Sequence, residues 1–118
     1  MNGATVVSKA NVLLLEQPLN GKVIADELIR VITNIAKSLA YKDKIIGHIK
    51  AIVIWEDEHL HVSTTSIDQL AVKMSKHWYE NDFSKVKITI NIIVFNYDRQ
   101  FIENVLSQSI RNSIFATM

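Results

Sequence analysis

The sequence predicts a single α+β domain of the ferredoxin-like class, with the element order βαββαβ and an additional C-terminal helix. Two observations support this prediction. Four segments are typical of strands, three through alternation of apolar residues and one through its β-branched and aliphatic composition, and in three others apolar residues recur every three to four residues. The chain has 118 residues, of which 48% are hydrophobic and 21% charged, so we expect one globular domain over residues 1–118.

The first expected elements are a strand and a long helix. Residues 5–16 are rich in β-branched and aliphatic side chains and are followed by Pro18, which is typical of a strand and its end. Asn20 is then expected to cap a helix. The apolar stripe of this helix consists of Val23, Ile24, Leu28, Val31, Ile32, Ile35, Ala36 and Leu39.

A hairpin is expected next, from strands at residues 45–55 and 59–65. A two-residue turn would pair Val53 with Leu60 and keep apolar side chains on one face, whereas a three-residue turn would mix histidines into that face. Burial should therefore select the two-residue turn. The opposite face would then carry His48, Lys50, His59, His61, Ser63 and Thr65.

The last three elements are predicted as helix, strand and helix. Ser66 and Gln69 have the spacing of a capping box, and Ile67, Leu70, Ala71, Met74 and Trp78 follow at helical spacing. Apolar residues alternate from Val86 to Val94, as in a strand. Asp98 is expected to cap a last helix, whose stripe consists of Phe101, Ile102, Val105, Leu106, Ile110, Ile114 and Phe115.

Right-handed crossovers would place the first and third strands at the centre of a four-stranded sheet. The strand with the histidines would then be central, and the strand with Gly47 would lie at an edge. If the two middle helices cover one face, the other face exposes Ile52, Ile54, Ile93 and Phe95, an apolar patch typical of an interface. We therefore expect a homo-oligomer, most simply a symmetric homodimer, formed through this sheet face or the C-terminal helix. As an alternative, the C-terminal helix itself covers the face.

Composition argues against several function classes. The chain has 13 basic and 12 acidic residues, a net charge of +1, and this balance gives no reason to expect nucleic acid or a membrane as partner. It has no cysteine, which excludes disulfides and thiol catalysis. The N-terminal residues lack the pattern of a signal peptide, and the apolar runs are too short for a membrane span, so we expect a cytoplasmic protein.

The histidines are the strongest candidates for a site. On one sheet face, His48, His59 and His61 could converge on a metal ion such as Zn²⁺. His48, Lys50, His61 and Ser63 could together bind a small ligand. The alternative is that the imidazoles only decorate a solvent-exposed sheet face.

Three more specific enzyme or binding motifs find little support. His61 to Ser63 has the His-x-hydroxyl form of the two-histidine phosphoesterases, but the only comparable segment, residues 48–50, ends in Lys. A Ser63–His61–Asp68 triad would lack a nucleophile-elbow pattern. An RNA-recognition module would need aromatic residues on its central strands, and residues 5–16 contain none.

No protein family is recognised from these residues. The sequence therefore predicts a small, non-enzymatic binding or assembly module without a cofactor. The alternative is a small metal- or phosphate-handling enzyme that uses a histidine cluster on the open sheet face, and enzymatic activity stays undecided at this level.

Overall fold

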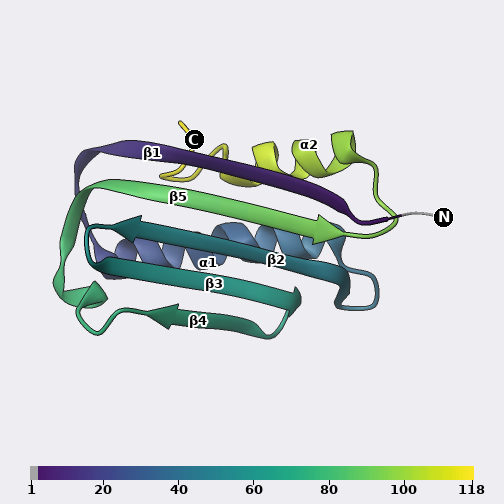
Figure 1. Ribbon diagram of the computed structural model, residues 1–118, viewed down its shortest axis with the longest axis horizontal. Helices are drawn as coiled ribbons and strands as arrows, with labels where there is room; N and C mark the ends of the chain where they lie inside the picture. Colours follow the sequence, from purple (N-terminus) through teal and green to yellow (C-terminus); the bar gives the residue numbers. More distant parts are fainter. Residues whose placement is uncertain (1–2) are drawn as a thin grey trace.

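The computed structural model describes residues 3–118, which form a five-stranded antiparallel sheet and two α-helices (Figure 1). The order of the strands across the sheet is β1-β5-β2-β3-β4. The elements along the chain are β1 (Thr5–Asn20), α1 (Gly21–Leu39), β2 (Lys44–Trp55), β3 (Glu58–Ser66), β4 (Leu70–Met74), the 3₁₀ helix η1 (Trp78–Glu80), β5 (Asp82–Val94) and α2 (Arg99–Ile110).

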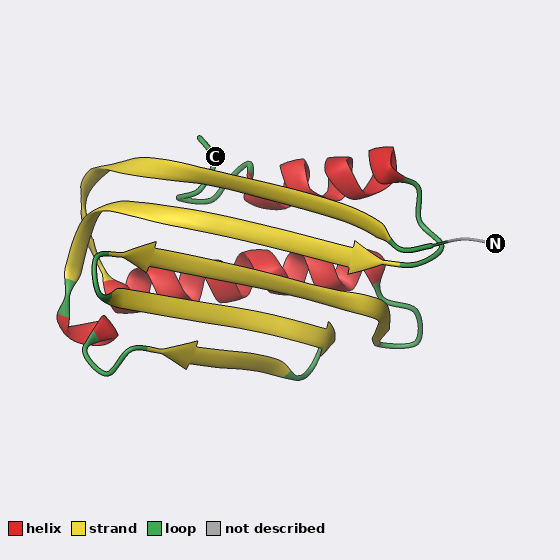
Figure 2. Ribbon diagram, in the orientation of Figure 1, coloured by secondary structure: helices red, strands yellow, loops and turns green. Residues whose placement is uncertain are grey.

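Both α-helices lie on the same side of the sheet, and the side facing the viewer in Figure 2 carries no helix. α1 packs beneath the middle strands, and α2 lies beside α1 near β1. The helices and the sheet bury one continuous apolar core, in which Leu28, Ile32, Ile49 and Ile90 are fully buried. The coarse prediction of an α+β domain is therefore confirmed, and the C-terminal helix α2 lies on the same side as α1 and leaves the other sheet face of the described chain free of helices.

The predicted ferredoxin-like order βαββαβ is wrong. The segment expected to form the second helix forms the short strand β4 and the 3₁₀ helix η1, so the described chain has five strands and two α-helices. β4 pairs with β3, with Leu60 opposite Met74 and Val62 opposite Val72. Leu70, Val72 and Met74 alternate along β4, while Leu70, Met74 and Trp78 also fit a helical spacing. The apolar positions alone could not distinguish the two periods.

Side-chain hydrogen bonds turn the chain where the helix was expected to begin. The Ser66 hydroxyl donates to Asp68 Oδ1 (3.1 Å) and so does not act as a helix cap, while the Ser66 amide donates to Thr64 Oγ1 (3.0 Å). The Thr64 hydroxyl also lies 3.2 Å from the carbonyl oxygen of Gln69. Hydroxyl side chains commonly stabilise such local turns at the expense of a helix. The chain therefore reverses directly from β3 into β4.

The positions of the strands in the sheet also differ from the prediction. β1 is an edge strand, β2 is central between β5 and β3, and the histidine strand β3 lies between β2 and β4. Because no helix connects β3 to β5, the crossover that would have centred β1 and β3 does not exist. Gly47 therefore lies in the central strand and has φ +133°, and a Cβ there would lie 1.9 Å from the Ile93 carbonyl oxygen.

Several local predictions are confirmed. The turn between β2 and β3 has two residues, Glu56 and Asp57, and it pairs Val53 with Leu60 as expected. The Asn20 side chain caps α1 by accepting from the Lys22 amide (2.9 Å). Asp98 caps α2 in the same way. α2 ends at Ile110, so the predicted stripe is too long, and Phe115 is buried from the turns that follow the helix.

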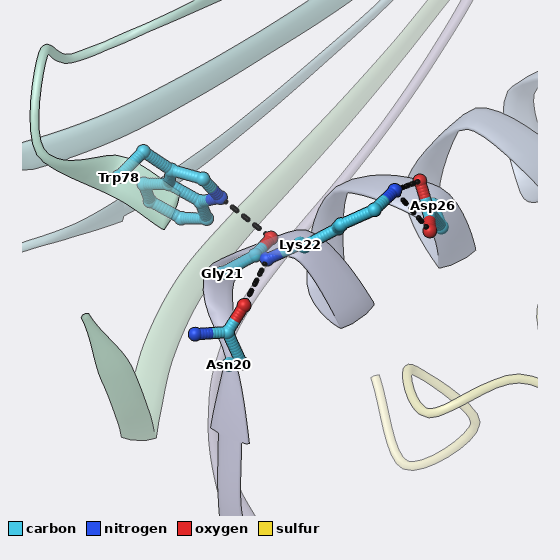
Figure 3. Close-up of polar contacts among 5 residues, drawn as sticks. All are labelled: Asn20, Gly21, Lys22, Asp26 and Trp78. Carbon is cyan, nitrogen blue, oxygen red and sulfur yellow. Dashed lines mark hydrogen bonds and ion pairs between the residues drawn. The ribbon is translucent and has the colours of Figure 1, made fainter. Parts of the chain in front are cut away.

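Trp78, in the segment between β4 and β5, bonds to the start of α1 (Figure 3). Its indole Nε1 donates to the Gly21 carbonyl oxygen (2.7 Å), and its ring stacks on Phe83 with centroids 4.5 Å apart. A Cβ on Gly21 would lie 2.1 Å from the Trp78 carbonyl oxygen, so the close approach requires glycine. Nearby, Lys22 and Asp26 form an exposed ion pair of 3.1 Å, which adds little stability.

Candidate functional site

The uncovered side of the sheet, hereafter the open face, is the candidate site. The strand register places on it the side chains that alternate with the buried ones. Over the regularly paired parts of the strands, these are Val6, Ser8, Ala10, Val12 and Leu14 of β1; Lys85, Lys87, Thr89, Asn91 and Ile93 of β5; His48, Lys50, Ile52 and Ile54 of β2; His59, His61, Ser63 and Thr65 of β3; and Ala71 and Lys73 of β4. The predicted sharing of one face by the polar residues of β2 and β3 is thus confirmed.

Basic side chains from four strands lie close together on the open face. Lys50 is opposite Ser63, and His61 is opposite Lys73. Ile54 lies between Lys87 on β5 and His59 on β3. Because directly opposite side chains in an antiparallel pair are neighbours, these residues form one group. We call Lys50, His59, His61, Lys73 and Lys87 the cationic patch.

Among these regularly paired residues, none is Asp or Glu; Glu16 of β1 follows the last regular pair of β1 and β5, Leu14 with Lys85. The acidic side chains lie instead on helices, turns and strand ends, such as Asp26 and Glu27 on α1 and Asp57 in the hairpin turn. The three ion pairs within residues 3–118 are on α1 and around η1, and none includes a patch residue. The open face is therefore more basic than the near-neutral net charge of the chain indicates.

The pKa of His61 reflects these surroundings. Partial burial lowers this pKa from the ordinary value, and His59, Lys50 and Lys73 lower it further because their positive charge disfavours a protonated imidazole. The His59 and His61 rings meet edge to face with centroids 5.1 Å apart. An anion bound on the patch would act in the opposite direction and favour the protonated ring.

A shallow pocket of about 330 Å³ adjoins the patch. It is lined by His48, Lys50, Ser63, Thr64, Thr65, Gln69 and Ala71. Three of the four residues predicted to bind a ligand, namely His48, Lys50 and Ser63, therefore line the same pocket. The fourth, His61, lies outside it, opposite Ile52, which is two residues from Lys50 along β2. A pocket with a lysine, a hydroxyl and an imidazole could accept a small anion.

The structure does not bring the three predicted metal ligands together. His48 pairs with Ile93 and lies four residues along β2 from Ile52, the residue opposite His61. At the rise of a strand this separates His48 from His61 by roughly 13 Å. Within residues 3–118 there is no group of three His, Asp or Glu side chains that could hold a metal ion. Asp68, the third residue of the hypothetical triad, bonds to Ser66.

Sequence reasoning missed Lys73 and Lys87 as members of the site. Lys73 was assigned to the expected second helix, and only the pairing of β4 with β3 brings it beside His61. Lys87 lies on a strand, as predicted. Its neighbours differ from the prediction, because β5 pairs with β2 and not only with β1. The alternation Val72-Lys73-Met74 was the signal that could have indicated a strand at this point.

Comparisons with known proteins leave the function open. No protein-family model and no curated protein matches the chain. Two solved structures are similar, both of the zinc-bound YjiA GTPase: one from E. coli at 13% identity and a triple mutant at 14%. Each alignment covers 86% of this chain but 29% of the GTPase chain, with a TM-score of 0.37. A similarity at this level carries no argument about fold or activity.

No helix in residues 3–118 combines the length and apolar character needed to cross a membrane. The cytoplasmic location stays a prediction from the sequence.

Proposed function

We propose that the protein is a non-enzymatic binding module, and that its open face docks an acidic segment of another protein. The observation that carries this proposal is the cationic patch, which lies on an uncovered sheet face with no carboxylate among its regularly paired residues. Lysines that have no acidic neighbour are available to a partner. Electrostatic complementarity of this kind guides association and selects the partner.

The partner should be partly apolar as well as acidic. Val12 and Ile54 are 45% and 42% exposed on the same face, and Ile52 lies between Thr89 and His61. Aliphatic side chains that alternate with cations fit a segment in which apolar and acidic residues also alternate. Burial of the aliphatic groups would supply affinity, while the charges would set the orientation.

The same face fits a protein better than a nucleic acid. Sequence-tolerant binding of single strands depends on aromatic side chains on which bases stack. None of the five patch residues is Phe, Tyr or Trp. The patch also offers only three lysines, Lys50, Lys73 and Lys87, which is few for a surface that must neutralise a run of phosphates.

Charge also bears on the predicted homo-oligomer. If two copies met through their open faces, two cationic patches would be brought together without carboxylates to balance them, which costs free energy. Self-association through the sheet face is therefore disfavoured relative to an acidic partner, and any homo-oligomer should use another surface.

A titration monitored by NMR tests the proposal. The ¹⁵N-labelled protein would be titrated with a synthetic peptide in which Glu and Leu alternate, and with a matched Lys–Leu peptide as control. We expect amide shifts along β2, β3, β4 and β5 with the Glu–Leu peptide only, and weaker binding at higher salt. Shifts confined to α1, or tighter binding of a single-stranded oligonucleotide, would contradict the proposal.

The pocket beside the patch supports a second candidate, a small phosphate-handling enzyme. His48, Lys50 and Ser63 could bind a phosphate group, although no nucleophile and base are paired there in the described structure. Inorganic phosphate is the simplest probe. Shifts limited to the pocket residues and lost in Lys50→Ala, together with hydrolysis of p-nitrophenyl phosphate, would favour the enzyme over the binding module.

A further inference from the structure

The outer edge of β1 is the second unusual surface of this molecule. β1 pairs with β5 on one side, and no described strand pairs with its other side. Long free edges are normally shortened, covered or protected by charges, because their unpaired backbone groups can pair with another chain. Over Thr5–Leu14, where its register with β5 is unbroken, β1 carries a single charged residue, Lys9.

We propose that a second copy of this chain pairs with the edge of β1, antiparallel to it, and joins the two sheets around a twofold axis at Ala10. An antiparallel pair of identical strands is self-complementary, so both copies use the same residues. Opposite residues in such a pair point to the same face, so residues of equal parity must meet. Only a few registers satisfy this condition within the regular part of β1.

The register centred on Ala10 fits the side chains best. It places Val6 of each copy opposite Leu14 of the other, and these side chains are 44% and 76% exposed in the single chain. On the helical face it places Val7 opposite Leu13. A register centred on Lys9 would oppose two lysines directly, which is destabilising. A register centred on Val12 would run into the irregular segment between Leu14 and Leu19.

A pocket and an exposed aromatic ring at opposite ends of β1 supply an independent argument. The pocket, of about 370 Å³, lies at one end and is partly apolar: Leu14, Leu19 and Ile114 line it together with polar residues such as Glu16 and Gln17. Phe101, which is 43% exposed, belongs to the other end, because it stacks on Tyr97, whose carbonyl oxygen accepts from the Thr5 hydroxyl (2.7 Å).

Antiparallel pairing would bring the Thr5 end of one copy to the pocket end of the other. The exposed Phe101 ring of one copy and the pocket of the other copy would then lie at the same end of the interface. In Figure 1, α2 lies partly beyond the outer side of β1, where it would support the neighbouring strand of a second copy. This surface is separate from the cationic patch, so the two proposals can fail independently.

Light scattering after size exclusion tests the inference. We expect the wild-type protein to be a dimer at tens of micromolar, and Leu14→Lys to raise the dissociation constant roughly tenfold, because it replaces both apolar Val6–Leu14 pairs of the dimer. Leu14 is largely exposed in the single chain, so this change should leave the fold intact. Ile54→Lys on β2 is the matched control, and it should not affect the dimer.

Crosslinking tests the register. The chain has no cysteine, so Ala10→Cys introduces a single thiol. Opposite Cα atoms in an antiparallel pair are about 4.5–5.5 Å apart, within the range of a disulfide. We expect a covalent dimer on oxidation with Ala10→Cys, and none with the control Ile54→Cys. A wild-type monomer at this concentration, or a dimer that neither forms this crosslink nor responds to Leu14→Lys, would overturn the inference.

Discussion

The two faces of the central strand β2 differ in whether folding requires the residue types that they carry. Ile49 and Val53 are fully buried on the face that α1 covers, whereas Ile52 and Ile54 lie on the open face among lysines and histidines. The buried face is uniformly apolar because it forms the core. The open face combines aliphatic groups with cations and has no carboxylate among its regularly paired residues, and folding requires none of these residue types. The difference teaches that the fold is carried by one face and that function should be sought on the other.

Two isoleucines of β2 provide the strongest test of this contrast. Ile49→Ala leaves a cavity in the core and should lower the free energy of unfolding by about 2–5 kcal/mol. Ile54→Ala removes a side chain that is 42% exposed and should cost less than about 1 kcal/mol. Chemical denaturation of both variants measures the two values. Equal losses would show that the open face is covered and that the contrast is false.

Glycine substitutions probe how closely β2 and β5 approach each other. Gly47→Ala places a methyl group 1.9 Å from the Ile93 carbonyl oxygen at a positive φ, so we expect a loss of about 1–3 kcal/mol. Gly3→Ala is the matched control, because nothing lies within 4 Å of a Cβ at that position. Thermal unfolding should show a clear decrease in Tm for the first variant and none for the second.

A smaller effect is expected when pH changes the charge on the open face. The pKa of His61 is lowered in the folded chain, so the unfolded chain binds a proton more readily as pH falls below about 6.5. His61 should therefore not affect the pH dependence of stability well above this pH and should oppose folding below it. We expect the loss of stability between pH 7 and pH 5 to be smaller in His61→Gln than in the wild type. Denaturation curves at the two pH values measure this difference, and an identical loss in both proteins would argue against the lowered pKa.

Local features could be predicted from the sequence because their signals lie within a few residues. The cap at Asn20 and the apolar stripe of α1 needed only helical spacing. The two-residue turn at Glu56 and Asp57 followed from keeping Leu60 and Val62 on the buried face.

The sheet topology could not be predicted in this way. Leu70 and Met74 fit a helix and a strand equally well, and the choice was decided by hydrogen bonds around Thr64 and by the pairing of β4 with β3. The order of strands depends on that choice. The cationic patch depends in turn on the order, because Lys73 and Lys87 reach the histidines only when β4 flanks β3 and β5 flanks β2.

A charge-swap experiment tests the central claim most directly. Calorimetric titration would compare the wild type with Lys50→Glu/Lys73→Glu, each against the Glu–Leu and the Lys–Leu peptide, with exposed Lys37→Glu on α1 as control. We predict that the wild type and Lys37→Glu bind only the Glu–Leu peptide, and that the double variant loses this binding and gains affinity for the Lys–Leu peptide. Unchanged binding of the Glu–Leu peptide by the double variant would contradict the assignment of the open face as the docking site.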